Sequence, residues 1–398
     1  MDMKNASFGT KAIHGGETLL DPHGALATPI YQNATYRFDT CEQGGRRFAG
    51  EETGGIYTRL GNPTTNVAES RMAVLENTEA ALGFASGMGA ISSVTWTICK
   101  AGSHILADST LYGCTFAMLL HGLKRYGVDI SFVDFADLEA YQAALREETA
   151  MVYFETPANP NMKIIDIRQV SDIAHAFNPE IKVVCDNTFA TPYLQRPVEL
   201  GCDVSLHSAT KYLNGHGDVL AGFACGTLEL MTQVRFTGLK DLTGAVQSPH
   251  DSYLVLRGLK TLELRMDRHC ENAEKLAQYL RSKPQVEKVY FPGLEDHPGH
   301  EIAKKQMSRF GGMLAFEVKG GKQGGIDLLN NMELCVRAVS LGTPETLVEH
   351  PASMTHSPYT PEELVEAGIS QGLIRVSAGL ECIADIIADF EQSFAKMK

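Results

Sequence analysis

Between residues 80 and 225 the chain alternates short apolar runs with stretches whose apolar residues recur at helical spacing. Continuous apolar runs are typical of strands that are buried on both faces of a sheet. When helices separate such strands, the strands form a mostly parallel sheet with helices on both sides. We therefore predict an α/β fold with strands at 81–85, 104–107, 130–133, 151–154, 182–185, 204–207 and 220–225.

The N-terminal part of the chain lacks this pattern. Residues 1–60 are rich in glycine, threonine and charged residues and show little periodicity. A segment with so few apolar groups buries little surface of its own, so we expect either disorder or an extended arm on another surface. A helix is predicted to begin at Asn62-Pro63, because an N-cap residue precedes a proline at the first helical position.

The region after Pro249 predicts a further domain. A long helical stretch over 251–281 leads to apolar segments near 286–290, 313–318 and 373–377, and a last helix is predicted from Ile383. The 398 residues also exceed what one hydrophobic core usually organises. We expect three parts: an N-terminal arm (1–60), a large α/β domain (61–250) and a smaller C-terminal α+β domain (251–398).

Composition excludes several classes of protein. The net charge of −13 disfavours binding to nucleic acids and anionic membranes. The nine cysteines are odd in number, are spread along the chain and include no C-x-x-C pair, which argues against a disulfide framework or a zinc knuckle. The N-terminus has no apolar signal-peptide core, and no apolar run approaches the roughly 18 residues of a membrane span. We expect a cytoplasmic protein.

Two polar residues follow neighbouring strands of the predicted sheet. Asp186 comes directly after the run 182–185, and Lys211 follows the run 204–207. Ligands of open α/β sheets bind outside the carboxyl ends of the strands. A lysine drawn into such a cleft has a lowered pKa and a nucleophilic amine. Taken singly, Asp186 could be a turn or helix-capping residue and Lys211 a surface lysine.

Together, the two segments predict a cofactor. Pyridoxal 5′-phosphate (PLP) requires an amine that forms an imine, a carboxylate that keeps the pyridine nitrogen protonated, and donors for a phosphate. Lys211 and Asp186 supply the first two, and the hydroxyls of Ser208 and Thr210 are candidates for the third. The sequence therefore predicts a PLP enzyme without a metal site.

A glycine-rich segment adds a second candidate anion site. In the stretch FASGMGA a strand runs into a helix start, where the backbone N–H groups of Gly87 and Met88 can face an anion. The same stretch partly imitates a dinucleotide fingerprint, Gly87-x-Gly89-x-x-Ser92, with Asp108 about 20 residues further on. Since Ser92 replaces the third glycine, a nicotinamide enzyme is the less favoured alternative, and a non-catalytic binding protein is another.

Two further residues have both a functional and a structural interpretation. Tyr112 follows the second predicted strand, where its ring could stack on a cofactor and its hydroxyl could transfer a proton, although most tyrosines only pack. Arg375 interrupts the apolar segment 373–377. A buried guanidinium needs a partner, and a substrate carboxylate and a structural salt bridge are equally plausible.

The chain resembles the Cys/Met-metabolism PLP-dependent enzymes over essentially its whole length. The resemblance rests on six segments in one order: YTR-x-x-NPT (57–64), ASGM (85–88), ETPANP (155–160), DNTF (186–189), HSATKY (207–212) and HPASMTH (350–356). It implies a fold-type I, PLP-dependent transferase-like architecture. It also implies a homotetramer, a dimer of dimers whose active sites are shared between subunits.

The resemblance assigns a role to each candidate residue. Lys211 would carry the cofactor and shuttle protons, Asp186 would pair with the ring nitrogen, and Tyr112 would stack on the ring. Arg375, with Ser340 nearby, would bind the substrate's α-carboxylate. The phosphate would be held by Ser208, Thr210, Gly87 and Met88, and by Tyr57 and Arg59 from a neighbouring subunit.

Three local features bear on the substrate. Cys114 stands two residues after Tyr112 and could hydrogen-bond with Lys240 and Asp241, although a free cysteine is most often a small buried hydrophobe. The loop 238–244 resembles that of family members that cleave methionine. Val339 precedes Ser340, where relatives that act on cystathionine have an acid. We expect α,γ-elimination of methionine, with side activity on homocysteine and cysteine; cystathionine cleavage and sulfhydrylation of O-acetylhomoserine are the alternatives.

For the leaving sulfur, Tyr112 is the expected proton donor. It can supply this proton if the nearby cationic groups of Arg59 and Lys211 lower its pKa.

Overall fold

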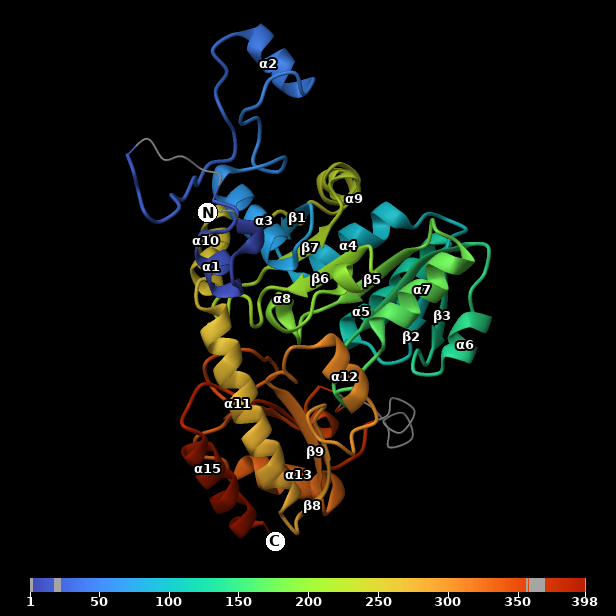
Figure 1. Ribbon diagram of the computed structural model, residues 1–398, viewed down its shortest axis with the longest axis vertical. Helices are drawn as coiled ribbons and strands as arrows, with labels where there is room; N and C mark the ends of the chain where they lie inside the picture. Colours follow the sequence, from blue (N-terminus) through green and yellow to red (C-terminus); the bar gives the residue numbers. More distant parts are fainter. Residues whose placement is uncertain (1–2, 18–22, 356, 358–368, 398) are drawn as a thin grey trace.

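The computed structural model describes residues 3–17, 23–355, 357 and 369–397 (Figure 1). Its largest element is a seven-stranded sheet in the order β1-β7-β6-β5-β4-β2-β3. Only β7 runs antiparallel to its neighbours, so the sheet is mostly parallel, as predicted. The strands are β1 (Ala80–Phe84), β2 (His104–Asp108), β3 (Asp129–Val133), β4 (Thr149–Glu155), β5 (Lys182–Asp186), β6 (Val204–Ser208) and β7 (Gly222–Gly226).

Helices cover both faces of this sheet (Figure 1). The first of them, α3 (Pro63–Glu76), begins where the sequence predicts: the side chain of the N-cap residue Asn62 accepts a hydrogen bond from the Thr64 N–H at 3.0 Å. The others are α4 (Gly87–Ile98), α5 (Gly113–Ala117), α6 (Leu138–Ala143), α7 (Ile167–Phe177), α8 (Thr191–Leu194) and α9 (Leu228–Gln233), which continues as the π-helical segment η5 (Val234–Thr243).

A smaller domain follows along α10 (Pro249–Leu259) and α11 (Leu262–Arg281). The sequence predicted one long helical stretch here, but the chain breaks at Lys260-Thr261, where it leaves α3 and turns toward the second sheet (Figure 1). That sheet has the order β10-β11-β12-β9-β8. Its elements are β8 (Val286–Tyr290), β9 (Met313–Val318), β10 (Val336–Arg337), β11 (Leu347–Glu349) and β12 (Leu373–Ser377), with helices α12 (His300–Gln306), α13 (Gly321–Asn330) and α15 (Ile383–Lys396).

The N-terminal segment is more structured than expected. Helix α1 (Phe8–His14) packs against α3 and α11 of the same chain and buries Ala12 completely. The buried Arg71 of α3 donates hydrogen bonds to the carbonyls of Ala12 and Gly15, which fixes the end of α1. Residues 8–14 are therefore helical and pack on the domain of their own chain.

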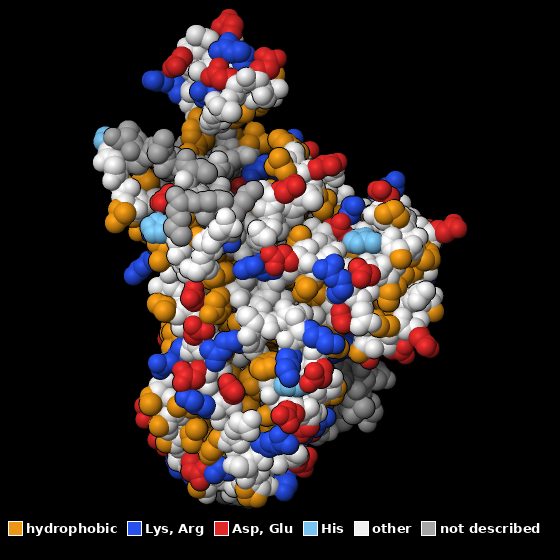
Figure 2. All heavy atoms as spheres, in the orientation of Figure 1, with side chains coloured by type: hydrophobic (Ala, Val, Ile, Leu, Met, Phe, Trp, Pro, Cys, Tyr) orange, Lys and Arg blue, Asp and Glu red, His pale blue; other side chains and the backbone are white. Residues whose placement is uncertain are grey.

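Beyond α1 the chain does project from the body. Helix α2 (Cys41–Phe48) stands clear of both domains, and its tip carries acidic and basic side chains (Figures 1 and 2). Its stability is local: Thr40 caps the helix by accepting from the Gln43 N–H, and Glu52 pairs with Arg46 and Arg47. No helix in the described ranges is long and apolar enough to cross a membrane.

Candidate active site

A cavity of about 240 Å³ lies at the carboxyl ends of β4, β5 and β6, where segments of the smaller domain close over the large sheet. Parallel strands bring the residues that follow them to one edge, so the cavity gathers side chains from distant parts of the sequence. Nine of the predicted residues line it: Gly87, Met88, Tyr112, Asp186, Ser208, Thr210, Lys211, Ser340 and Arg375.

Lys211 enters the cavity as a largely buried amine. Its Nζ donates a hydrogen bond to Ser340 Oγ at 3.0 Å, which links the large domain to the smaller one. Burial lowers the pKa of Lys211, and the nearby Arg375 lowers it further, while Glu349 acts in the opposite direction. A lowered pKa increases the fraction of neutral amine, which is the form that attacks an aldehyde.

Asp186 ends β5 as a half-buried carboxylate. Oδ1 accepts hydrogen bonds from the N–H and hydroxyl of Thr188, at 3.0 and 2.5 Å, whereas among the described residues Oδ2 has only a 3.5 Å contact with the Tyr153 hydroxyl. Burial raises the pKa of Asp186, and the hydrogen bonds from Thr188 oppose this rise. A cationic partner at Oδ2 would offset the cost of burying the charge.

Glu155 lies beside Asp186, as its register partner on β4, and was given no role in the sequence analysis. Its Oε1 accepts the backbone N–H of Tyr112 at 2.8 Å, so it anchors the segment that carries that ring. Burial raises the pKa of Glu155 well above its usual value, and the charge of Asp186 raises it further. The polar residue that ends an apolar strand, the same signal as for Asp186, could have identified it.

The start of α4 forms the predicted anion site. The N-cap Ser86 accepts a hydrogen bond from the Gly89 N–H, and the first N–H groups of the helix have no carbonyl partner within it. A Cβ at Gly87 would lie 2.8 Å from Ser208 Cβ, so only glycine allows Ser208 this close. Thr210 also lines the cavity, but its hydroxyl bonds with the backbone N–H and C=O of Ala221.

Arg375, on β12, combines the two interpretations left open by the sequence. It forms a 2.5 Å ion pair with Glu349, and it also lines the cavity. Its Nη1 donates to Asn159 Oδ1 at 2.8 Å and its Nη2 to the Ser340 carbonyl at 3.1 Å. The sequence analysis missed Glu349 and Asn159, because neither partner can be identified without the fold.

Tyr112 lines the cavity. In the single chain a hydrogen bond with Cys114, followed by burial, raises the pKa of Tyr112 to about 12. Arg59, one of the cations expected to lower the pKa, lies in a different cleft of the chain. Cys114 itself is exposed and not a buried hydrophobe. Within the described chain, no hydrogen bond joins it to Lys240 or Asp241.

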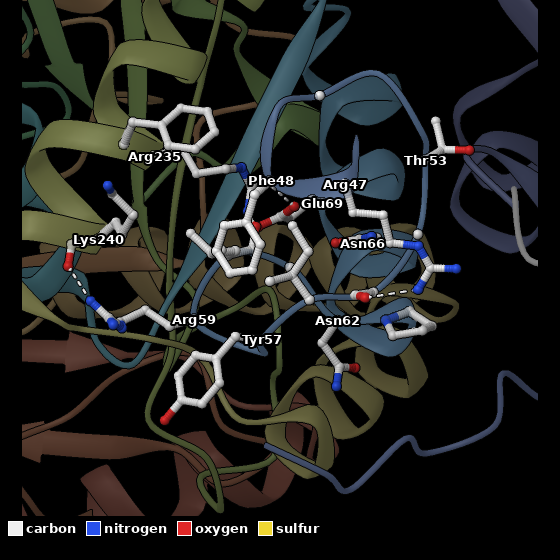
Figure 3. Close-up of a pocket in the computed structure, with 18 of the residues that line it drawn as sticks. Arg47, Phe48, Thr53, Tyr57, Arg59, Asn62, Asn66, Glu69, Arg235 and Lys240 are labelled. Carbon is white, nitrogen blue, oxygen red and sulfur yellow. Dashed lines mark hydrogen bonds and ion pairs between the residues drawn. The ribbon is translucent and has the colours of Figure 1, made fainter. Parts of the chain in front are cut away.

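Three further predicted residues, Tyr57, Arg59 and Lys240, line a second cleft, of about 1450 Å³, between the projecting arm and the large domain. Figure 3 shows Arg59 beside Lys240, with Tyr57 below them. Arg59 Nη1 donates to the Lys240 carbonyl at 2.7 Å, and its guanidinium carbon lies 5.7 Å from the centroid of the Tyr57 ring. Lys240 Nζ pairs with Asp241 at 3.0 Å. The four residues therefore form one surface cluster.

The structure argues against the dinucleotide-binding alternative, because Asp108 is not available to bind a ribose. Asp108 is fully buried, and Lys163 Nζ binds its Oδ2 at 2.6 Å. The backbone N–H groups of Thr110 and Phe135 also donate to its carboxylate. A carboxylate engaged in this way is not available to a ribose.

The groups that remain in the first cavity fit PLP. A partly buried amine, a partly buried carboxylate with one weakly engaged oxygen, and a glycine-lined helix N-terminus converge there. Fold and site together define an α/β enzyme that works with PLP.

Comparison with known proteins specifies the class. The chain matches the Cys/Met metabolism PLP-dependent enzyme family over residues 9–395 and belongs to it. It is 59% identical, over 397 residues and 100% of both chains, to L-methionine gamma-lyase of Fusobacterium nucleatum. It is 57% identical to the L-methionine gamma-lyase of Treponema denticola, over 100% of this chain and 98% of the relative.

A solved structure also matches. Cystathionine gamma-lyase from Lactobacillus plantarum, complexed with L-serine, superimposes with a TM-score of 0.91 at 38% identity and covers 98% of this chain and 99% of its own. The predicted family, fold class and cofactor are thereby confirmed.

Proposed function

We propose that this enzyme cleaves L-methionine by α,γ-elimination to methanethiol, 2-oxobutanoate and ammonia, with side activity on homocysteine and cysteine. The supporting observation is that Leu220, Val339 and Leu341 are apolar residues among those that line the cavity. An uncharged thioether fits against such residues, whereas the distal ammonium of cystathionine would lack a counter-charge there. The identities to two L-methionine gamma-lyases support the same choice.

Residues that line the cavity would bind PLP. Lys211 would bind it through its amine, and Asp186 would face the ring nitrogen and keep that nitrogen protonated. Ser208 and the N–H groups of Gly87 and Met88 would hold the phosphate, while Thr210 would contribute only by exchanging its bond to Ala221. When bound, PLP supplies an electron-poor ring that accepts the negative charge left on the substrate's α-carbon.

The chain's own groups orient the substrate and move its protons. Arg375, with Ser340 nearby, would bind the α-carboxylate. Lys211, whose pKa is lowered by burial and by Arg375, can take the α-proton as a neutral amine. After Lys211 has passed this proton on to the bound cofactor, its neutral amine can take a second proton from the β-carbon, and the electron pair left there can expel sulfur from the γ-carbon. One water then hydrolyses the remaining four-carbon unit to 2-oxobutanoate and ammonia.

Tyr112 would protonate the departing sulfur. Because its pKa is raised to about 12, the phenol keeps its proton at neutral pH and can donate it. We expect Tyr112→Phe to slow methanethiol release by about 10²–10⁴-fold. PLP content, read from the visible absorbance, should stay near that of the unmodified enzyme. If the variant turns over at full speed, another group protonates sulfur.

The surface cluster of Tyr57, Arg59, Lys240 and Asp241 would act in a neighbouring subunit. Arg59 binds Lys240 in this chain, so the cluster would reach the neighbour as one unit and bring cations toward its phosphate site and its Cys114. A homotetramer built from two such dimers is part of the same proposal. A cytoplasmic location remains part of the proposal.

The proposed reaction predicts products from methionine alone. We expect the purified enzyme to release methanethiol and 2-oxobutanoate in equal amounts, without added sulfide. A cystathionine lyase would prefer cystathionine, and a sulfhydrylase would need sulfide and O-acetylhomoserine. Val339→Glu is a matched control, because an acid at this position should shift the ratio of kcat/KM values toward cystathionine. Absence of 2-oxobutanoate from methionine would refute the assignment.

A further inference from the structure

Glu349 is placed to control the proposed carboxylate-binding arginine. It is the register partner of Arg375 across the antiparallel pair β11–β12, so both side chains emerge on the same face of the sheet. Their ion pair measures 2.5 Å, and the side chains are only 3% and 9% exposed. On its other side Arg375 faces Ala315 of β9, whose methyl group offers no competing polar atom.

Both oxygens of Glu349 are engaged. Oε2 binds Arg375, and Oε1 accepts a hydrogen bond from the Thr355 hydroxyl at 2.6 Å. The carboxylate is therefore held from two directions. Such an anchored partner can fix the orientation of a guanidinium, which a mobile surface acid cannot do.

The geometry at Arg375 sets its orientation before a substrate arrives. The guanidinium donates two hydrogen bonds, from Nη1 to Asn159 and from Nη2 to the Ser340 carbonyl, and Nη2 also forms the ion pair with Glu349. The partners come from the loop after β4, the loop after β10 and β11, so the arginine is clamped between the two domains. Preorganisation of this kind reduces the entropy lost when a carboxylate binds.

The charges of Arg375 and Glu349 also affect the pKa of Lys211. Burial and Arg375 lower the pKa of Lys211, while Glu349 raises it. Glu349 also raises the pKa of Arg375, as do the hydroxyls of Tyr212 and Tyr112, against the lowering that burial causes. Glu349 is therefore the anion that balances Arg375 near the reactive amine.

We propose that Glu349 is a positioning residue: it holds Arg375 in the pose that receives the substrate's carboxylate, and it limits the positive charge that Arg375 places beside Lys211. The inference rests on the carboxylate-binding role proposed for Arg375. It extends the substrate site to an acid that does not line the cavity itself.

Two substitutions in the PLP-loaded enzyme separate the two effects. Glu349→Gln keeps the length but removes the charge, so the pH midpoint of the cofactor's visible absorbance should fall by about one unit, because Arg375 is then unbalanced. Glu349→Asp keeps the charge but shortens the reach, so the midpoint should stay while KM for methionine rises by about tenfold or more. Glu317→Gln is a matched control, since this β9 acid binds Tyr290 and should change neither value.

An Arg375 variant distinguishes failure of the role inferred for Glu349 from failure of the carboxylate-binding role proposed for Arg375. If Arg375 binds the carboxylate, Arg375→Met should raise KM for methionine whatever the role of Glu349. If it does so while both Glu349 variants keep the unmodified midpoint and KM, Glu349 is only structural and the inference fails. If Arg375→Met leaves KM unchanged, the proposed role of Arg375 fails first.

Discussion

A Lys211→Ala variant is expected to lose turnover of methionine by at least about 10⁴-fold, together with the visible absorbance of lysine-bound PLP. The same amine would bind the cofactor and carry protons, so its removal eliminates two functions at once. It lies in a cavity that lowers its pKa through burial and through Arg375. The readouts are initial rates with methionine and the spectrum of the purified protein after incubation with PLP.

Lys211→Arg is the matched control for this experiment. Arginine keeps a positive charge in the cavity but cannot lose its proton at accessible pH, so it cannot form the bond to the cofactor. The variant should therefore be as inactive and as colourless as Lys211→Ala, while its thermal unfolding stays closer to that of the unmodified protein. Retained turnover in either variant would show that another group performs the chemistry.

The sheet was predictable because its strands are buried on both faces. Each of the seven apolar runs forms a strand, since a continuous apolar run between helices has few other ways to bury its side chains. Strands β10 and β11 were missed because two and three residues are too short to show periodicity. The placement of α1 depends on Arg71, 56 residues after the Gly15 carbonyl that it binds, and no local pattern reveals such a contact.

The site was predictable to the extent that it follows the strands. Asp186 and Lys211 each come after a buried strand, and parallel strands carry such residues to the same edge. Glu349 and Asn159 could not be identified in this way, because their roles arise from contact with Arg375 across two domains. The lowered pKa of Tyr112 stays a prediction because it depends on Arg59 of a neighbouring subunit. In the single chain Arg59 lies in another cleft, and the pKa of Tyr112 is raised to about 12.

Asp186→Asn should lower kcat for methionine by about 10²–10³-fold while leaving much of the PLP bound. The proposed role of Asp186 is to keep the ring nitrogen protonated, and a neutral amide of the same shape cannot stabilise that charge. Thr188 would still hold the side chain, because an amide oxygen can accept the hydrogen bonds that Oδ1 now accepts. The measurement is kcat with methionine, together with the cofactor content of the purified variant.

The neighbouring carboxyl provides the control for this prediction. Burial and the charge of Asp186 raise the pKa of Glu155 well above its usual value, whereas the hydrogen bonds from Thr188 oppose the rise that burial causes at Asp186. Glu155→Gln keeps an oxygen for the Tyr112 N–H and leaves the carboxylate proposed to face the ring nitrogen, so its loss of kcat should be much smaller than that of Asp186→Asn. If the order is reversed, the ring nitrogen depends on Glu155. The end of β4, and not the end of β5, would then carry the anion that makes the cofactor electron-poor.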